Sequence, residues 1–159
     1  MGQTISMVMF SASLALMPLT VRADDPKVVT AVKVEFRRAE TKLGKGLVEA
    51  VIQGKKEEKV YLHPNAELTH QDIESAFVDS FGSSANEYMV QVAFTKEGAR
   101  KMTALSKEHL HKPLAILIDG KVVSAPVIAS ELSNGCVIAG NFKKEEAERI
   151  AKQLSAQRK

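Results

Sequence analysis

Beyond residue 27, the first half of the chain consists of short stretches in which apolar and polar positions alternate. In residues 28–36 apolar side chains recur at every second position, which predicts a strand with one buried face. Residues 47–52 and 59–62 predict two further strands, and the polar residues 53–58 between them predict a hairpin turn. The apolar face of the first strand consists of Val32, Val34 and Phe36.

A helix is predicted after this hairpin. Thr69 is a suitable N-cap, because its hydroxyl can accept a hydrogen bond from the backbone N–H of Asp72. Apolar residues follow at a spacing that would place them on one helical face, and residues 82–84 predict a loop. These apolar residues are Ile73, Ala76 and Phe77.

The second half of the chain is patterned more regularly. Residues 88–95 alternate and predict a half-buried strand, and Thr95 is the expected N-cap of the helix that follows. Pro113 ends that helix, and the continuous apolar run 114–118 predicts a central strand. The apolar side of the helix consists of Ala99, Met102, Leu105 and His109.

Turn-forming residues separate the last predicted elements. Asp119 and Gly120 predict a type I′ hairpin turn, because both central positions of that turn need a positive φ. Residues 121–128 are expected to return as the paired strand. After a turn at 134–135, residues 136–142 predict another strand, and a helix ends the chain. The apolar stripe of this helix consists of Ala147, Ile150, Ala151 and Leu154.

The order of these elements predicts the fold class. Strands and helices do not alternate regularly, and few segments could form the right-handed crossovers that a parallel sheet requires. We therefore expect an α+β domain, with a mostly antiparallel sheet and helices packed on one face.

The N-terminal region has the composition of a secretory signal. Residues 5–20 contain no charged residue, and small residues follow at the two positions that signal peptidase reads. We expect residues 1–23 to be a signal peptide cleaved after Ala23, which leaves one domain over residues 24–159 in the periplasm or cell envelope. Two alternatives stay open: an uncleaved anchor, for which the apolar run is short, and myristoylation of Gly2.

The charge of the chain gives little support to a nucleic-acid partner. The chain has 22 Lys and Arg against 19 Asp and Glu, and removal of Arg22 with the signal peptide leaves 21 against 19. Basic and acidic residues share the clusters at 55–59 and 143–146, as is typical of solvated turns and helix ends. We therefore expect no nucleic-acid binding.

The polar residues do not have the spacing of a catalytic or metal site. The histidines lack carboxylates at matching positions, so we expect surface histidines and no metal. Cys136 opens an apolar strand and is expected to be a buried small side chain, while Ser124 lacks the glycines of a nucleophile elbow. We expect no enzyme activity and no cofactor, and the binding residues stay unknown. The histidines are His63, His70, His109 and His111.

Several segments together carry a family resemblance. They are VAFTKEGAR (92–100), KPLAILIDGKVVSAPVI (112–128) and GNFKKEEA (140–147), with residues 60–62 and 68–73 upstream. On these segments the chain, most strongly over residues 87–157, resembles the head subdomain of the large first periplasmic domain of SecD and SecDF, the protein-export membrane proteins.

The resemblance implies a fold more than a reaction. It implies that Thr95 caps a helix and that Gly98 lets this helix lie close to the sheet. Lys143 stands where the family usually has a Ser or Thr N-cap, and loss of such a cap costs about 1 kcal/mol. The family couples proton flow through transmembrane helices to movement of this domain. Since the sequence has no counterpart of that membrane part, the resemblance implies a free-standing exported head without a transmembrane channel of its own.

Two functions are compatible with this reading. The first is a non-catalytic module of protein export that contacts unfolded preproteins, by strand addition or through an apolar groove. The alternative is a periplasmic domain that reuses the fold to bind an unrelated envelope protein or a small ligand. In the first case the partner is a polypeptide, and the sequence fixes neither its identity nor the oligomeric state.

Overall fold

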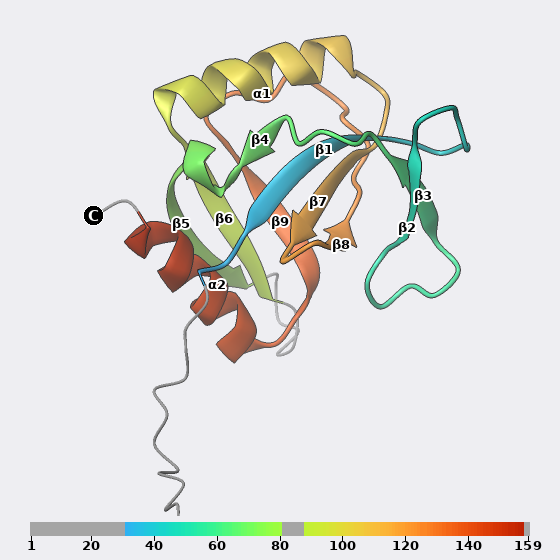
Figure 1. Cartoon of the computed structure of the whole chain (residues 1–159). Helices are drawn as coiled ribbons and strands as arrows, with labels where there is room; N and C mark the ends of the chain where they lie inside the picture. Colours follow the sequence, from blue (N-terminus) through green and yellow to red (C-terminus); the bar gives the residue numbers. More distant parts are fainter. Residues whose placement is uncertain (1–30, 81–87, 158–159) are drawn as a thin grey trace, which may run out of the picture.

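The computed structural model describes residues 31–80 and 88–157 (Figure 1). The expected signal peptide, the start of the first predicted strand and the predicted loop at 82–84 lie outside the described residues. The elements in chain order are β1 (Val34–Glu40), β2 (Val48–Val51), β3 (Lys59–Leu62), β4 (Leu68–Thr69), the 3₁₀ turn η1 (His70–Asp72), β5 (Ile73–Ser80), β6 (Tyr88–Phe94), α1 (Lys96–Glu108), β7 (Leu114–Ile118), β8 (Lys121–Ser124), β9 (Gly135–Phe142) and α2 (Lys144–Ala156).

The described strands form two antiparallel sheets. The larger sheet has the order β2-β3-β1-β7-β8, with β4 also paired to β1, and the smaller sheet has the order β5-β6-β9. Helix α2 packs on β5 and β6, whereas α1 contacts β4, η1 and β6. Figure 1 shows the two helices on different sides of the molecule. The predicted α+β class with antiparallel pairing is confirmed, although the strands are divided between two sheets.

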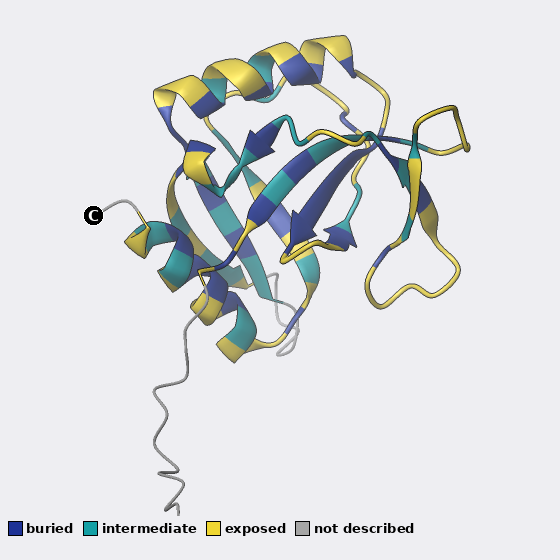
Figure 2. Cartoon of the chain, viewed as in Figure 1, coloured by how far each residue is buried: buried dark blue, intermediate teal, exposed yellow. Residues whose placement is uncertain are grey.

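The central strand β7 is buried on both faces, as its continuous apolar sequence predicts (Figure 2). Leu114, Ile116 and Ile118 belong to the larger hydrophobic core, which also contains residues of both helices and of the small sheet. Ala115 and Leu117 point the other way, into a smaller core. The alternation of side chains along one strand therefore joins the two cores.

The smaller core lies inside a curled sheet. The order of the sheet places β2 and β8 at opposite ends, yet the N–H of Gln53, just after β2, donates to the backbone oxygen of Val122 at 2.8 Å. The sheet therefore bends far enough for its two ends to meet. The enclosed side chains are Ala39, Ile52, Val60, Leu62, Ala115, Leu117 and Val122.

The predicted helix after Thr69 is wrong. The Thr69 cap forms as expected, but it starts only the short turn η1, and strand β5 follows it directly. The cause is a β-bulge between Ile73 and Ser75. The bulge adds a residue, so that Ile73 and Ala76 both face the core at a spacing of three, which imitates a helix, while Phe77 is 54% exposed.

The other boundaries agree with the predictions to within a few residues. In the described part, the first strand covers Val34–Glu40 rather than residues 28–36, although Val32, Val34 and Phe36 are buried as expected. The strand predicted over residues 121–128 ends at Ser124. Asp119 and Gly120 have φ values of 50° and 80°, as a type I′ turn requires. Lys143 makes no side-chain cap bond to α2.

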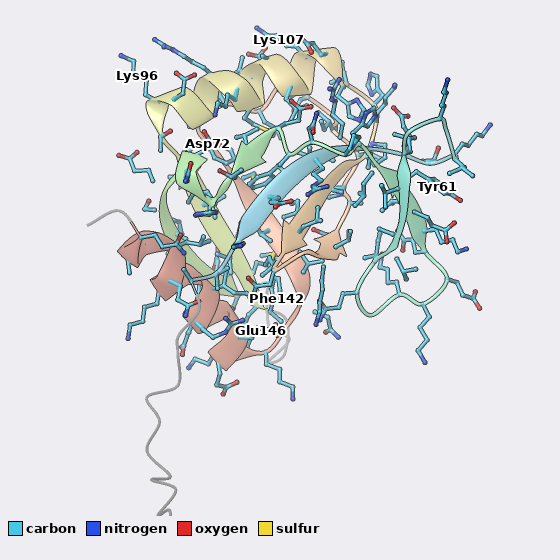
Figure 3. All side chains as sticks on the ribbon, viewed as in Figure 1. Tyr61, Asp72, Lys96, Lys107, Phe142 and Glu146 are labelled. Atoms are coloured by element: carbon cyan, nitrogen blue, oxygen red, sulfur yellow. The ribbon has the colours of Figure 1, made fainter. Side chains whose placement is uncertain are left out.

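The start of α1 lies directly against the turn η1 (Figure 3). The Thr95 hydroxyl accepts a hydrogen bond from the N–H of Gly98 at 2.9 Å, and the Thr95 N–H donates to the backbone oxygen of Asp72 at 2.8 Å. The Asp72 carboxylate also accepts a 2.8 Å bond from the Lys101 ammonium. A Cβ on Gly98 would lie 2.3 Å from the Asp72 backbone oxygen, so only glycine allows this contact.

We expect Gly98→Ala to destabilise the fold by about 1–3 kcal/mol, because the added methyl must push α1 away from η1. In an exposed helix the same substitution would stabilise by roughly 0.5–1 kcal/mol, so the sign of the change is diagnostic. Urea unfolding of wild type and variant measures it. Gly44→Ala is the matched control, since its Cβ would meet only the flexible Leu47 side chain. An unchanged or higher stability of Gly98→Ala would contradict the assigned contact.

Candidate functional site

One face of the three-stranded sheet is open in the described structure. The strand register aligns Phe77 of β5, Gln91 of β6 and Val137 of β9 in one row across this face. Phe77 is 54% and Val137 42% exposed. The side chains that point the other way pack into the larger core. We call the row Phe77, Gln91 and Val137, with the neighbouring Met89 and Ala93 of β6, the open face.

One edge of this sheet is formed by β5, which pairs with β6 on one side only. The Ser155 hydroxyl of α2 accepts a hydrogen bond from the Ala76 N–H at 3.1 Å and donates one to the Ala76 backbone oxygen at 3.0 Å. The backbone groups of Ala76 therefore point away from β6. In an antiparallel ladder this direction repeats at every second residue, so those of Val78 point outward as well.

Two carboxylates flank the outward backbone groups of β5. Glu74 is exposed, and Asp79 accepts bonds from the Gln91 side-chain amide at 2.6 Å and from the Ser80 N–H at 2.8 Å. Among the ion pairs of the described residues, none involves Glu74 or Asp79. This edge of the sheet therefore has a negative local charge.

The prediction of surface histidines is wrong for His109. Its side chain is buried, and its Nε2 lies 3.1 Å from the Ala39 oxygen and 3.2 Å from the Pro113 oxygen. Both oxygens accept hydrogen bonds, which assigns the ring proton to Nε2. His109 thus ties the end of α1 to β1 and to the start of β7. The prediction from the periodicity that His109 lies on the apolar side of the helix is confirmed.

A small charged cluster surrounds this histidine. The Lys112 ammonium lies 3.0 Å from a Glu40 carboxylate oxygen, and His63 Nε2 lies 3.7 Å from the same oxygen. The His63 and His109 rings meet edge to face. The hydrogen bond from Lys112 is the main reason why the pKa of Glu40 lies below its ordinary value. The cluster holds the end of β1 against the turn before β7.

The lowered pKa of Glu40 predicts an acid-dependent contribution to stability. The carboxyl titrates near 4.5 in the unfolded chain and lower in the folded one, so on acidification the unfolded state binds its proton first. The contribution is full above pH 4.5 and is lost as the pH falls through the folded pKa. We expect the unfolding free energy of Glu40→Gln to fall less steeply than that of wild type below pH 4.5.

Urea unfolding at several acidic pH values checks this expectation. Glu57→Gln is the control, because Glu57 lies in the exposed turn between β2 and β3 and has no ion pair among the described residues. Equal slopes of stability against pH for wild type and Glu40→Gln would contradict the role of the Glu40–Lys112 pair.

Cys136 and Asp119 both have structural roles. Cys136 is partly buried against the larger core, and burial raises the pKa of its thiol to about 12, which keeps it in the unreactive thiol form. The Asp119 carboxylate accepts a bond from the Lys33 N–H at 3.0 Å and so supports the β7–β8 turn. Within residues 31–80 and 88–157, no three metal-ligating side chains gather at one point. Neither described helix is long and apolar enough to cross a membrane.

Comparison with known proteins identifies the family. The family described as SecDF, P1 head subdomain, matches residues 47–157. The chain belongs to this family. SecD of Magnetococcus marinus is 44% identical over 72 residues, which cover 45% of this chain and 14% of the relative. SecD of Endomicrobium trichonymphae is 33% identical over 109 residues, covering 67% and 23%. The chain thus spans less than a quarter of these relatives.

A solved structure supports the same assignment. A solved structure of SecDF, a membrane component that enhances protein export, superimposes with a TM-score of 0.61 at 27% identity, over 79% of this chain and 63% of that chain. The resemblance expected from residues 87–157 is therefore confirmed and extends upstream to residue 47. The chain is thus similar in fold and in sequence to the head subdomain of proteins of this family.

The open face and the β5 edge were not predicted from the sequence. The wrong helix assignment hid both, because Phe77 was assigned to a buried helical stripe. The alternation of Ala76 and Val78 on one face, with Phe77 on the other, was the available signal.

Proposed function

We propose that this domain is an exported, non-catalytic module that binds unfolded segments of secretory polypeptides. The family supports this proposal, because its relatives are translocase subunits and a component that enhances protein export. We further propose that residues 1–23 are removed after Ala23 and that the domain acts in the periplasm or cell envelope.

The observation that carries the proposal is the open face. A half-exposed phenylalanine and a half-exposed valine lie in one row on a sheet that no described element covers on that side. Unfolded polypeptides expose apolar side chains, whose transfer onto such a surface is favourable by about 25 cal/mol per Å². A face on which Gln91 lies between two exposed apolar side chains suits weak contacts with many sequences more than a tight site for one small molecule.

We expect the chain to bind a permanently unfolded secretory protein, reduced and carboxymethylated, more strongly than the folded form of that protein. Since apolar contacts carry the binding, affinity should change little between about 0.05 and 0.5 M salt. The paired change Phe77→Ser and Val137→Ser should weaken binding about three- to tenfold. Fluorescence anisotropy measures this on protein purified from the periplasm, whose intact mass also checks cleavage after Ala23.

Leu43→Ser is the matched control, because Leu43 is 70% exposed in the segment between β1 and β2 and lies outside the open face. Equal affinity for the folded and unfolded forms would contradict the proposal. Specific capture of one folded envelope protein would then favour the alternative, a domain that reuses the fold for another partner.

A further inference from the structure

We propose that β2 and the loops at its two ends dock on the surface of a bilayer that contains anionic phospholipids. This inference goes beyond the proposed function, because it adds a second partner and uses residues outside the open face. We call the docking surface the β2 rim. All of its residues are exposed, and they are Lys42, Leu43, Lys45, Val48, Val51 and Lys56.

The β2 rim concentrates exposed apolar side chains. Leu43 is 70%, Val48 56% and Val51 46% exposed, so three of the seven exposed large apolar residues of the described structure lie within residues 43–51. The two valines are three positions apart in β2 and therefore extend from opposite faces of the strand. A soft apolar layer that meets β2 along its border can contact both valines, whereas a rigid groove on one face cannot.

The fold leaves this border accessible. Strand β2 is the last strand of the larger sheet and pairs with β3. The β2–β3 hairpin extends from the molecule on the side away from α2 (Figure 1), and most of β2 and its flanking loops are exposed (Figure 2). The bond from Gln53 to Val122, where the ends of the curled sheet meet, lies beyond Val51 and leaves the two valines exposed.

The charges of the β2 rim favour an anionic partner. Lys42, Lys45 and Lys56 form no ion pair among the described residues. Two of the carboxylates in residues 41–59 are paired with neighbouring lysines, and among the described ion pairs only Glu57 has none. The free lysines stand at both ends of β2, so a negative surface along the strand would attract it at each end.

A bilayer fits this combination of lysines and apolar side chains better than an acidic macromolecule does. A nucleic acid would need side chains on which bases stack, and the β2 rim has no aromatic residue. Leu43 lies between Lys42 and Lys45, so its side chain can enter the boundary of the acyl chains while the lysine ammonium groups stay at the phosphates. Each lysine near an anionic membrane raises affinity about fivefold, which makes this binding weak and reversible.

The test is sedimentation of the protein purified from the periplasm with vesicles of phosphatidylcholine, alone or with about 30% phosphatidylglycerol. We expect binding to the anionic vesicles only, and loss of most of it between about 0.05 and 0.5 M salt. Lys42→Gln with Lys45→Gln should weaken binding about ten- to thirtyfold.

Lys96→Gln with Lys152→Gln is the control of equal charge. Both lysines are exposed on the helices, and neither forms an ion pair among the described residues. This pair should change binding by less than about twofold, since it lies outside the β2 rim.

Substitutions of Leu43 test the apolar contact. The chain contains no tryptophan, so the indole of Leu43→Trp reports on this loop alone. This variant should bind anionic vesicles about three- to tenfold more strongly, with its fluorescence shifted to shorter wavelength. Leu43→Ser should weaken binding about three- to tenfold. Leu110→Trp, at a residue 41% exposed in the turn after α1, should show neither the gain in binding nor the shift.

This inference and the proposed function fail separately. Phe77→Ser with Val137→Ser should leave vesicle binding unchanged, and Leu43→Ser should leave binding of the unfolded protein unchanged. If wild type does not bind anionic vesicles, or if the rim and control lysine variants lose binding equally, docking at the β2 rim is wrong and the proposed function stands. Capture of an acidic folded protein without vesicle binding would also overturn it.

Discussion

The structure depends on the burial of β7 on both faces. Five consecutive apolar residues, Leu114–Ile118, send alternate side chains into two hydrophobic cores, so that one strand of the curled sheet contributes to both cores. His109 and the Asp119–Gly120 turn fix the two ends of this strand. Since one strand serves both cores, a shift of its register by one residue would exchange the side chains of the two cores and disrupt both. This constraint fixes the position of β1, which pairs with β7. It also fixes the position of the small sheet, which packs against β7 in the larger core.

The same arrangement leaves the small sheet covered on one face only. Helix α2 and the larger core take up one side of β5, β6 and β9 and leave the row Phe77, Gln91 and Val137 uncovered by the described residues. The edge strand β5 is protected in two ways that natural sheets use, by charged side chains and by a covering helix. The Ser155 hydroxyl of this helix occupies both outward backbone groups of Ala76. The open face, in contrast, has no cover among the described residues.

Much of the fold could be predicted from periodicity and turn residues, and the candidate site could not. The run at 114–118, the Asp119–Gly120 turn and the Thr95 cap depend on local chemistry, which a sequence displays directly. The bulge at Ile73–Ser75 changes a period of two into a spacing of three, so β5 was assigned as a helix and its edge was missed. The burial of His109 needs acceptors from Ala39 and Pro113, and Ala39 lies 70 residues away in the chain. Such partners become visible only in three dimensions.

The central claim, that an unfolded polypeptide binds the open face, is tested most directly by NMR signals of single residues. Addition of a saturating unfolded secretory polypeptide should shift the signals of Phe77 and Val137 and leave that of Leu43, which lies outside the open face, nearly unchanged. Unchanged signals of Phe77 and Val137 under saturating conditions, with shifts elsewhere in the domain, would contradict the account.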